Sequence, residues 1–101
     1  MENNSKILLC VENAEERKSL HEMLSKNGYM HIEEAADGEQ AVSALTKSAY
    51  DLVLVDLWMS KIDGIGIIRR GVHLCEKSLP VFILLSPISK ESLLCEATEA
   101  G

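Results

Sequence analysis

A chain of 101 residues, 47% of them hydrophobic, has room for one domain with a packed core but not for two. Its formal net charge of -6, without a block of Lys or Arg, argues against direct binding to nucleic acid or to an anionic membrane surface. The first residues lack a signal-peptide pattern, and no apolar run approaches the roughly 20 residues of a membrane helix, so the sequence predicts a cytoplasmic protein.

Two strand and helix pairs are predicted in the first half of the chain. The apolar residues 6–11 predict a strand, and Asn13 with Glu16 has the form of a capping box that starts a helix. Residues 30–35 carry polar positions and predict a strand at an edge of the sheet. Asp37 then begins a second helix. The residues expected on the buried side of that helix are Ala41, Val42 and Leu45.

The second half of the chain repeats this alternation. Residues 52–55 are apolar throughout, as in a strand buried on both faces, and Asp56 follows directly. Asp63 can cap a third helix, residues 81–85 predict a fourth strand, and Ser89 can cap a last helix. The third helix is expected to carry on one side Ile65, Ile68 and Val72. This order predicts an α/β protein with a mostly parallel sheet and helices on both faces.

The three cysteines, Cys10, Cys75 and Cys95, are odd in number, far apart and set in apolar segments. This pattern favours reduced thiols in or near the core over a disulfide or a metal site. The three histidines are also dispersed, and none has the Cys or Ser partner that would suggest a hydrolase.

Polar residues follow three of the predicted strands. Because parallel strands end at a shared edge of the sheet, Glu12, Asp56 and Ser86 are expected to converge there. Two carboxylates and a hydroxyl suit Mg²⁺, which takes hard oxygen ligands and keeps several waters. A metal beside Asp56 would let this carboxylate attack a phosphoryl group. The spacing leaves open the alternative of a solvated acidic rim that binds nothing specific.

Several segments of the chain resemble the receiver domain of two-component response regulators. They are residues 6–13 (KILLCVEN), 34–41 (EAADGEQA), 50–56 (YDLVLVD), 62–64 (IDG), 79–86 (LPVFILLS) and 99–101 (EAG). In that family, the acid that matches Asp56 accepts a phosphoryl group from a histidine kinase. The resemblance therefore implies a phosphorelay signalling domain, with at most self-catalysed phosphotransfer, rather than an enzyme.

The resemblance also implies the remaining parts of the site and the fold. Glu12 and the backbone carbonyl of Trp58 would hold Mg²⁺ together with Asp56, and Ser86 would contact the phosphoryl group. The fold would be a flavodoxin-like doubly wound parallel sheet with strand order 2-1-3-4. The family's fifth strand, last helix and phosphate-pairing lysine are missing, so residues 1–101 are interpreted as one receiver-like domain truncated at its C-terminal end.

Three positions depart from the family pattern. Val11 replaces the first acid of the family's acidic pair, which should weaken metal binding. Ser60 replaces a loop proline, and Pro87 replaces a small residue whose N–H faces the phosphoryl group. The exchange at Ser60 is mild, whereas Val11, Pro87 and the missing lysine favour an alternative function: a pseudo-receiver that acts as a protein-interaction module without phosphate. A flavin or nucleotide binder is the poorer third interpretation, because acids after the first strand would repel a phosphate there.

The expected partner is a sensor histidine kinase or a phosphotransfer protein. If the chain is complete, residues 81–85 form an exposed apolar edge strand, which predicts a homodimer or an exchange of elements through that edge. Trp58, a bulky loop residue beside Asp56, is expected to give the site local cover.

Overall fold

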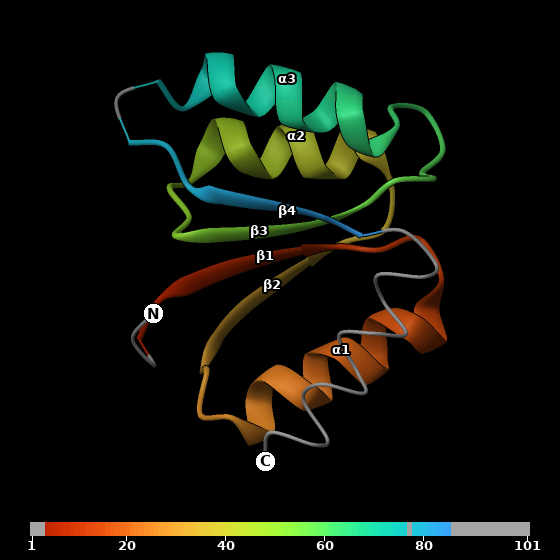
Figure 1. Cartoon of the computed structure of the whole chain (residues 1–101), viewed down its shortest axis with the longest axis vertical. Coiled ribbons are helices and arrows are strands. Elements are labelled where there is room, and N and C mark those ends of the chain that lie inside the picture. The colour runs from red at the N-terminus through yellow and green to blue at the C-terminus, as the bar shows by residue number, and fades with distance from the viewer. Residues whose placement is uncertain (1–3, 77, 86–101) are drawn as a thin grey trace.

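The computed structural model describes residues 4–76 and 78–85, and its centre is a parallel sheet (Figure 1). The described strands lie in the order β2-β1-β3-β4, and all adjacent pairs are parallel. Their bounds are β1 (Lys6–Cys10), β2 (His31–Ala35), β3 (Leu52–Asp56) and β4 (Val81–Leu85). The predicted order 2-1-3-4 and the flavodoxin-like fold are therefore confirmed.

Helices cover both faces of the sheet. In Figure 1, α1 (Ala14–Lys26) lies on one face, and α2 (Gly38–Lys47) and α3 (Gly64–Leu74) pack together on the other. Each helix begins after a side chain that accepts an N–H bond from the first turn, which confirms the predicted caps. These capping residues are Asn13, Asp37 and Asp63. The helix expected after Ser89 lies outside the described residues.

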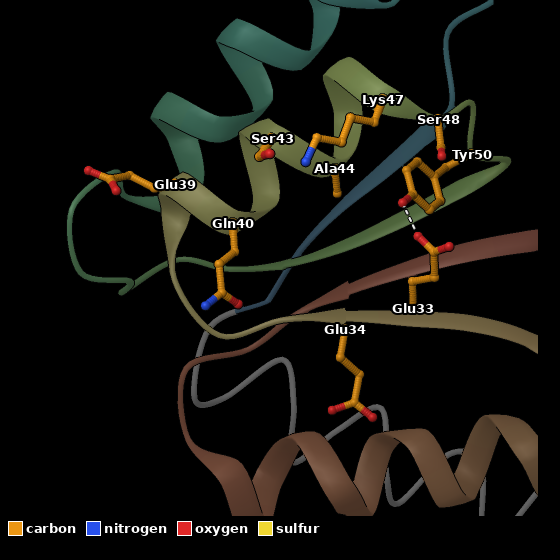
Figure 2. Close-up of a pocket in the computed structure, with 9 residues that line it drawn as sticks. All are labelled: Glu33, Glu34, Glu39, Gln40, Ser43, Ala44, Lys47, Ser48 and Tyr50. Atoms are coloured by element: carbon orange, nitrogen blue, oxygen red, sulfur yellow. Dashed lines mark hydrogen bonds between the residues drawn. The ribbon is translucent and has the colours of Figure 1, made fainter.

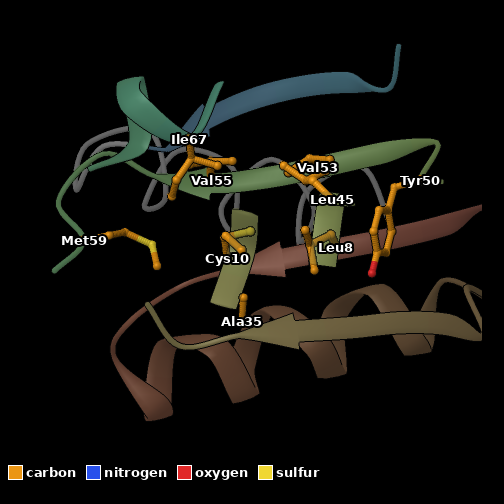
Figure 3. Packing of buried hydrophobic residues seen from close by; sticks show 10 residues of the cluster. Leu8, Cys10, Ala35, Leu45, Tyr50, Val53, Val55, Met59 and Ile67 are labelled. Carbon is orange, nitrogen blue, oxygen red and sulfur yellow. The ribbon is translucent and has the colours of Figure 1, made fainter. Parts of the chain in front are cut away.

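The two central strands, β1 and β3, separate two apolar clusters, because alternate side chains of a strand point to opposite faces. Figure 3 shows the cluster beneath α2 and α3, which includes Leu8, Cys10, Val53, Val55 and Ile67. The cluster beneath α1 includes Ile7, Leu9, Leu54, Leu20 and Leu24. Residues near the ends of β1 and β3 are thus held by a core on both sides.

The cysteines in the described part of the chain are free thiols. Cys10 is fully buried, and burial raises the pKa of its thiol to about 12, so the group stays protonated and unreactive at neutral pH. Cys75 is half-buried and also free. Both agree with the expectation of reduced thiols in or near the core, and Cys95 lies outside the described residues.

The buried side of α3 differs from the predicted one. The residues that α3 buries are Gly64, Ile67 and Gly71. Ile65 and Val72, which were expected to share the apolar side with Ile68, are 44% and 45% exposed, and only Ile68 packs partly against the core. A β-carbon on Gly71 would lie 2.7 Å from the ring of Phe82, so the helix approaches the sheet through its smallest residues.

Strand β4 is an edge of the sheet as far as the described residues extend. Leu85 is buried at its end, whereas three large apolar residues of the strand are exposed: Val81, Ile83 and Leu84. The strand is therefore apolar and exposed along most of its length. None of the helices in the described part of the chain has the length and the apolar character needed to cross a membrane.

Candidate functional site

Asp56 is the last residue of β3, and the residue is buried, with 6% of its surface exposed. It is in register with Leu85, the last residue of β4, and the next N–H, of Leu57, donates to the Leu85 carbonyl over 2.7 Å. The hydrogen-bonded pairing of β3 with β4 thus extends as far as Asp56. Asp56 stands at the carboxyl edge of the sheet, where open α/β sheets bind their ligands.

The residue level with Asp56 beside the neighbouring strand is Val11, which directly follows β1. The ladder pairs Cys10 with Val55, so the next residues, Val11 and Asp56, follow side by side. Val11 is fully buried in the cluster beneath α1, and its N–H donates to the Ala35 carbonyl over 3.2 Å. The position where the resemblance expects an acid therefore holds an apolar core residue.

Glu12, the next residue, has both carboxylate oxygens bound to Ser60. The Ser60 hydroxyl donates to Oε1 over 2.5 Å, and the Ser60 N–H donates to Oε2 over 3.2 Å. Ser60 lies four positions after Asp56 in the loop between β3 and α3. This contact was not predicted, although the exchange of a loop proline for a serine, which adds an N–H and a hydroxyl, was a signal for it.

The loop that contains Ser60 is held in a tight turn. The N–H of Ile62 donates to the Ser60 carbonyl over 2.8 Å, and Lys61 between them has a φ of 71°. These values describe a classic γ-turn, a rare and strained conformation for a residue other than glycine. The N–H of Gly38, the first residue of α2, donates to the same Ser60 carbonyl over 3.2 Å.

The Lys61 side chain reaches from this turn to the start of α2. Its Nζ lies 3.5 Å from Asp37 Oδ2 and 3.6 Å from Glu39 Oε2. The pKa of Asp37 lies below its usual value, chiefly because its carboxylate accepts the Gln40 N–H and also because Lys61 is near. The two loops are therefore joined by a backbone hydrogen bond and by charge.

Arg17, on the first turns of α1, anchors the loop that carries Glu12. Its Nη1 donates to the carbonyls of Val11 over 2.8 Å and of Glu12 over 3.2 Å. Its Nε donates to Glu34 of β2 over 2.8 Å, and the other oxygen of Glu34 lies 2.6 Å from Nδ1 of His21. Sequence reasoning missed this role, because the bonded groups are backbone carbonyls and a residue of another element.

The structure tests the prediction for Trp58 but not the predictions for Ser86 and Pro87. Trp58 is 69% exposed, so the expectation that it covers the site is wrong. Met59, the next residue, is buried in the core instead. Ser86 and Pro87 lie outside the described residues, and the role of the Trp58 carbonyl stays a prediction.

The oxygen groups near the carboxyl ends of β1 and β3 suit Mg²⁺ in kind. Carboxylates of Asp56 and Glu12 and a loop carbonyl at Trp58 are hard ligands of the type that Mg²⁺ takes, one or two carboxylates at a time. No group of three or more His, Cys, Asp or Glu side chains is gathered for a metal anywhere in residues 4–76 and 78–85. These oxygen groups are of the kind that Mg²⁺ takes, and they include one acid fewer than the resemblance implies.

A shallow pocket between β2 and α2 is separate from this site (Figure 2). It is lined by Glu33, Glu34, Glu39, Gln40, Ser43, Ala44, Lys47, Ser48 and Tyr50, and includes neither Asp56 nor Glu12. The Tyr50 hydroxyl donates to Glu33, and burial and this carboxylate raise the pKa of Tyr50, so the phenol stays protonated. Its hydroxyl therefore serves as a structural donor between β2 and the start of β3.

The family model of the response regulator receiver domain matches residues 7–101. The chain belongs to this family. Receiver domains are signalling domains of two-component systems that interact with histidine kinases or phosphotransfer proteins and generally bind Mg²⁺ at the active site. The recognition made from the sequence segments is confirmed.

Individual receiver proteins match nearly the whole chain. It is 33% identical over 99 residues to the transcriptional regulatory protein ResD of Bacillus subtilis, a match that covers 98% of this chain and 40% of ResD. It is also 33% identical over 98 residues to sporulation initiation phosphotransferase F of the same organism, covering 97% of this chain and 77% of that protein. The chain therefore spans less than half of ResD.

A solved structure supports the same assignment. A chain of the CheX–CheY–BeF3–Mg²⁺ complex from Borrelia burgdorferi matches with a TM-score of 0.75 and 27% sequence identity. This match covers 96% of the present chain and 72% of the other. The fold of the described residues is thus the fold of a receiver from a complex that contains Mg²⁺ and beryllium fluoride.

Proposed function

We propose that this receiver domain accepts a phosphoryl group on Asp56 from a sensor histidine kinase or a phosphotransfer protein in the cytoplasm. The observation that carries the proposal is the position of Asp56, a buried acid at the end of β3 in a receiver fold. Glu12 and the Trp58 carbonyl would share Mg²⁺ with Asp56, and Ser86 would contact the phosphoryl group. When bound, Mg²⁺ neutralises charge on the carboxylate and on the incoming group.

Phosphoryl transfer to Asp56 requires only one reacting group from this chain, the Asp56 carboxylate. One carboxylate oxygen of Asp56 forms a bond to phosphorus as the bond between phosphorus and the donor's nitrogen breaks, and the donor takes up the proton it needs on that nitrogen. The rigid end of β3 supplies the orientation, because its ladder to β4 extends to Asp56 and the following N–H. The domain is accordingly a signalling acceptor, with at most self-catalysed phosphotransfer.

The direct test is phosphorylation with a small donor. Incubation with acetyl phosphate and Mg²⁺ is expected to add the mass of one phosphoryl group, located on Asp56 by borohydride reduction and peptide mapping. Asp56→Asn should abolish the gain, whereas Asp51→Asn, at an exposed acid before the same strand, should leave it unchanged. Absence of any gain from a folded protein, at all Mg²⁺ concentrations, would contradict the proposal.

A pseudo-receiver is the second candidate function, and the site contains a specific reason for it. Val11 is an apolar core residue, and both oxygens of Glu12 are already engaged by Ser60. A receiver with these features could hold its loops in one arrangement without metal or phosphate and act through its surface alone. The absence of a phosphoryl gain in the experiment above would favour this function.

Association of two copies through β4 stays a prediction. An exposed apolar edge strand is a template for another strand, and Ile83 is one of three large exposed residues on β4. Light scattering is expected to show a dimer whose share grows with concentration and falls in Ile83→Lys. Val72→Lys, at an equally exposed position on α3, is the matched control. A monomer at every concentration would rule out this association.

A further inference from the structure

The contact between Glu12 and Ser60 joins two loops that are distant in sequence. The two residues are 48 positions apart, one in the loop between β1 and α1 and the other in the loop between β3 and α3. Both oxygens of the carboxylate accept a bond from the same residue, one from its hydroxyl and one from its N–H. Hydrogen bonds to a charged group are stronger than neutral ones, so this pair can hold the loops together.

The carbonyl of Ser60 extends the connection to a third loop. It accepts the N–H of Gly38, where the loop between β2 and α2 ends, and the N–H of Ile62 within its own γ-turn. All three polar groups of Ser60 are therefore used in bonds to other residues: its hydroxyl, its N–H and its carbonyl. Ser60 lies where the three loops at the carboxyl edge of the sheet meet.

The same two loops are those that a shared metal ion would join. Asp56 and Trp58 stand at the start of the loop after β3, and Glu12 stands in the loop after β1. An ion held by these residues would therefore connect the loops through charge. Ser60 connects them through hydrogen bonds that need no ion.

We propose that Ser60 is a positioning residue that binds the Glu12 carboxylate in place of a cation and closes the loops of the site in the metal-free protein. Ser60 is exposed and its bonds to Glu12 compete with water, so the closure is reversible. Mg²⁺ competes with Ser60 for the Glu12 carboxylate, because oxygens that already accept hydrogen bonds are weaker ligands. Ser60 therefore lowers the affinity of the site for Mg²⁺. This second consequence rests on the proposed function.

The first experiment uses the metal-free protein and does not depend on phosphorylation. Amide hydrogen exchange, measured by NMR, is expected to be several-fold faster at the Ser60 N–H in Glu12→Ala than in the unaltered chain. The Gly64 N–H, which donates to the Leu57 carbonyl in the same loop, serves as the internal control and should keep its rate. Equal exchange at Ser60 in the two proteins would overturn the inference.

The second experiment is a titration with MgCl₂ followed by Trp58 fluorescence. Ser60→Ala, which removes the shorter bond to Glu12, is expected to bind Mg²⁺ about tenfold more tightly. Ser60→Thr keeps the hydroxyl and the N–H and should restore the weaker affinity, and Ser43→Ala, at an exposed serine on α2, controls for a general effect. Unchanged or weaker binding in Ser60→Ala would overturn the inference.

The two experiments separate this inference from the function on which its second part rests. A folded protein that shows no response to Mg²⁺ in any variant would count against the phosphoryl-acceptor function. In that case, the exchange rate of the Ser60 N–H in the metal-free protein would alone test whether Ser60 binds Glu12 and closes the loops. Tighter Mg²⁺ binding in Ser60→Ala without phosphorylation of Asp56 would support the positioning role and contradict the acceptor role.

Discussion

Replacing Gly38 with alanine is expected to destabilise the domain by about 3 kcal/mol, since the new β-carbon cannot be accommodated without moving the backbone. It would lie 2.5 Å from the Cβ of Ile62 and 2.7 Å from the Ile62 nitrogen, and it would also collide with the Ile62 carbonyl oxygen. These atoms belong to the γ-turn of the loop after β3. Urea unfolding followed by circular dichroism measures the change in the free energy of unfolding.

Gly66→Ala is the matched control for this substitution. Its β-carbon would meet only side-chain atoms, at 2.9 Å from Cγ2 of Ile62 and 3.2 Å from Oδ1 of Asp63. Alanine also favours a helix interior by about 1 kcal/mol over glycine, which offsets this crowding. We therefore expect little net change in stability. If both variants lost the same stability, the tight packing assigned to Gly38 would be wrong.

Ile67→Ala is expected to lose about 2 to 5 kcal/mol, the usual range for deleting a large buried side chain from a packed core. Ile67 is fully buried in the cluster beneath α2 and α3, where it lies with Val53 and Val55 (Figure 3). Few of its neighbours can move into the space left behind, because β3 is buried along its whole length. Chemical unfolding with a single transition would give the loss directly.

Ile65→Ala supplies the comparison within the same helix. Ile65 is 44% exposed, so its truncation is expected to cost less than about 1 kcal/mol. The sequence-based choice of Ile65, Ile68 and Val72 as the apolar side predicts the opposite ranking. A larger loss for Ile65→Ala than for Ile67→Ala would show that α3 packs through that side after all.

The sequence was sufficient to predict the elements of the described residues and their order, because the signals are local. Asn13, Asp37 and Asp63 are capping residues next to their own helices, and the apolar runs of β1 and β3 have the length and composition of buried strands. The receiver family then supplies the strand order. Asp56 could be assigned to the sheet edge for the same reason, because it comes directly after an apolar run and ends β3.

Sequence reasoning failed where spatial neighbours carry no local signal. The buried side of α3 includes Gly64 and Gly71, which have no side chain to add to a hydrophobic pattern and are buried because the helix approaches closely. The bonds between Glu12 and Ser60 join positions far apart in the chain and depend on how two loops meet. Trp58 was expected to cover the site beside Asp56, whereas it is exposed and Met59, the next residue, is buried.

The positive φ of Lys61 limits how this loop can change during evolution. The Lys61 side chain is half exposed, so its charge and length can vary with little effect on the core. The conformation of its backbone, however, suits glycine and asparagine and disfavours residues branched at the β-carbon. A substitution at position 61 is therefore limited chiefly by the backbone conformation of the turn, and the loss of the Lys61 charge would remove only the ion pairs to Asp37 and Glu39.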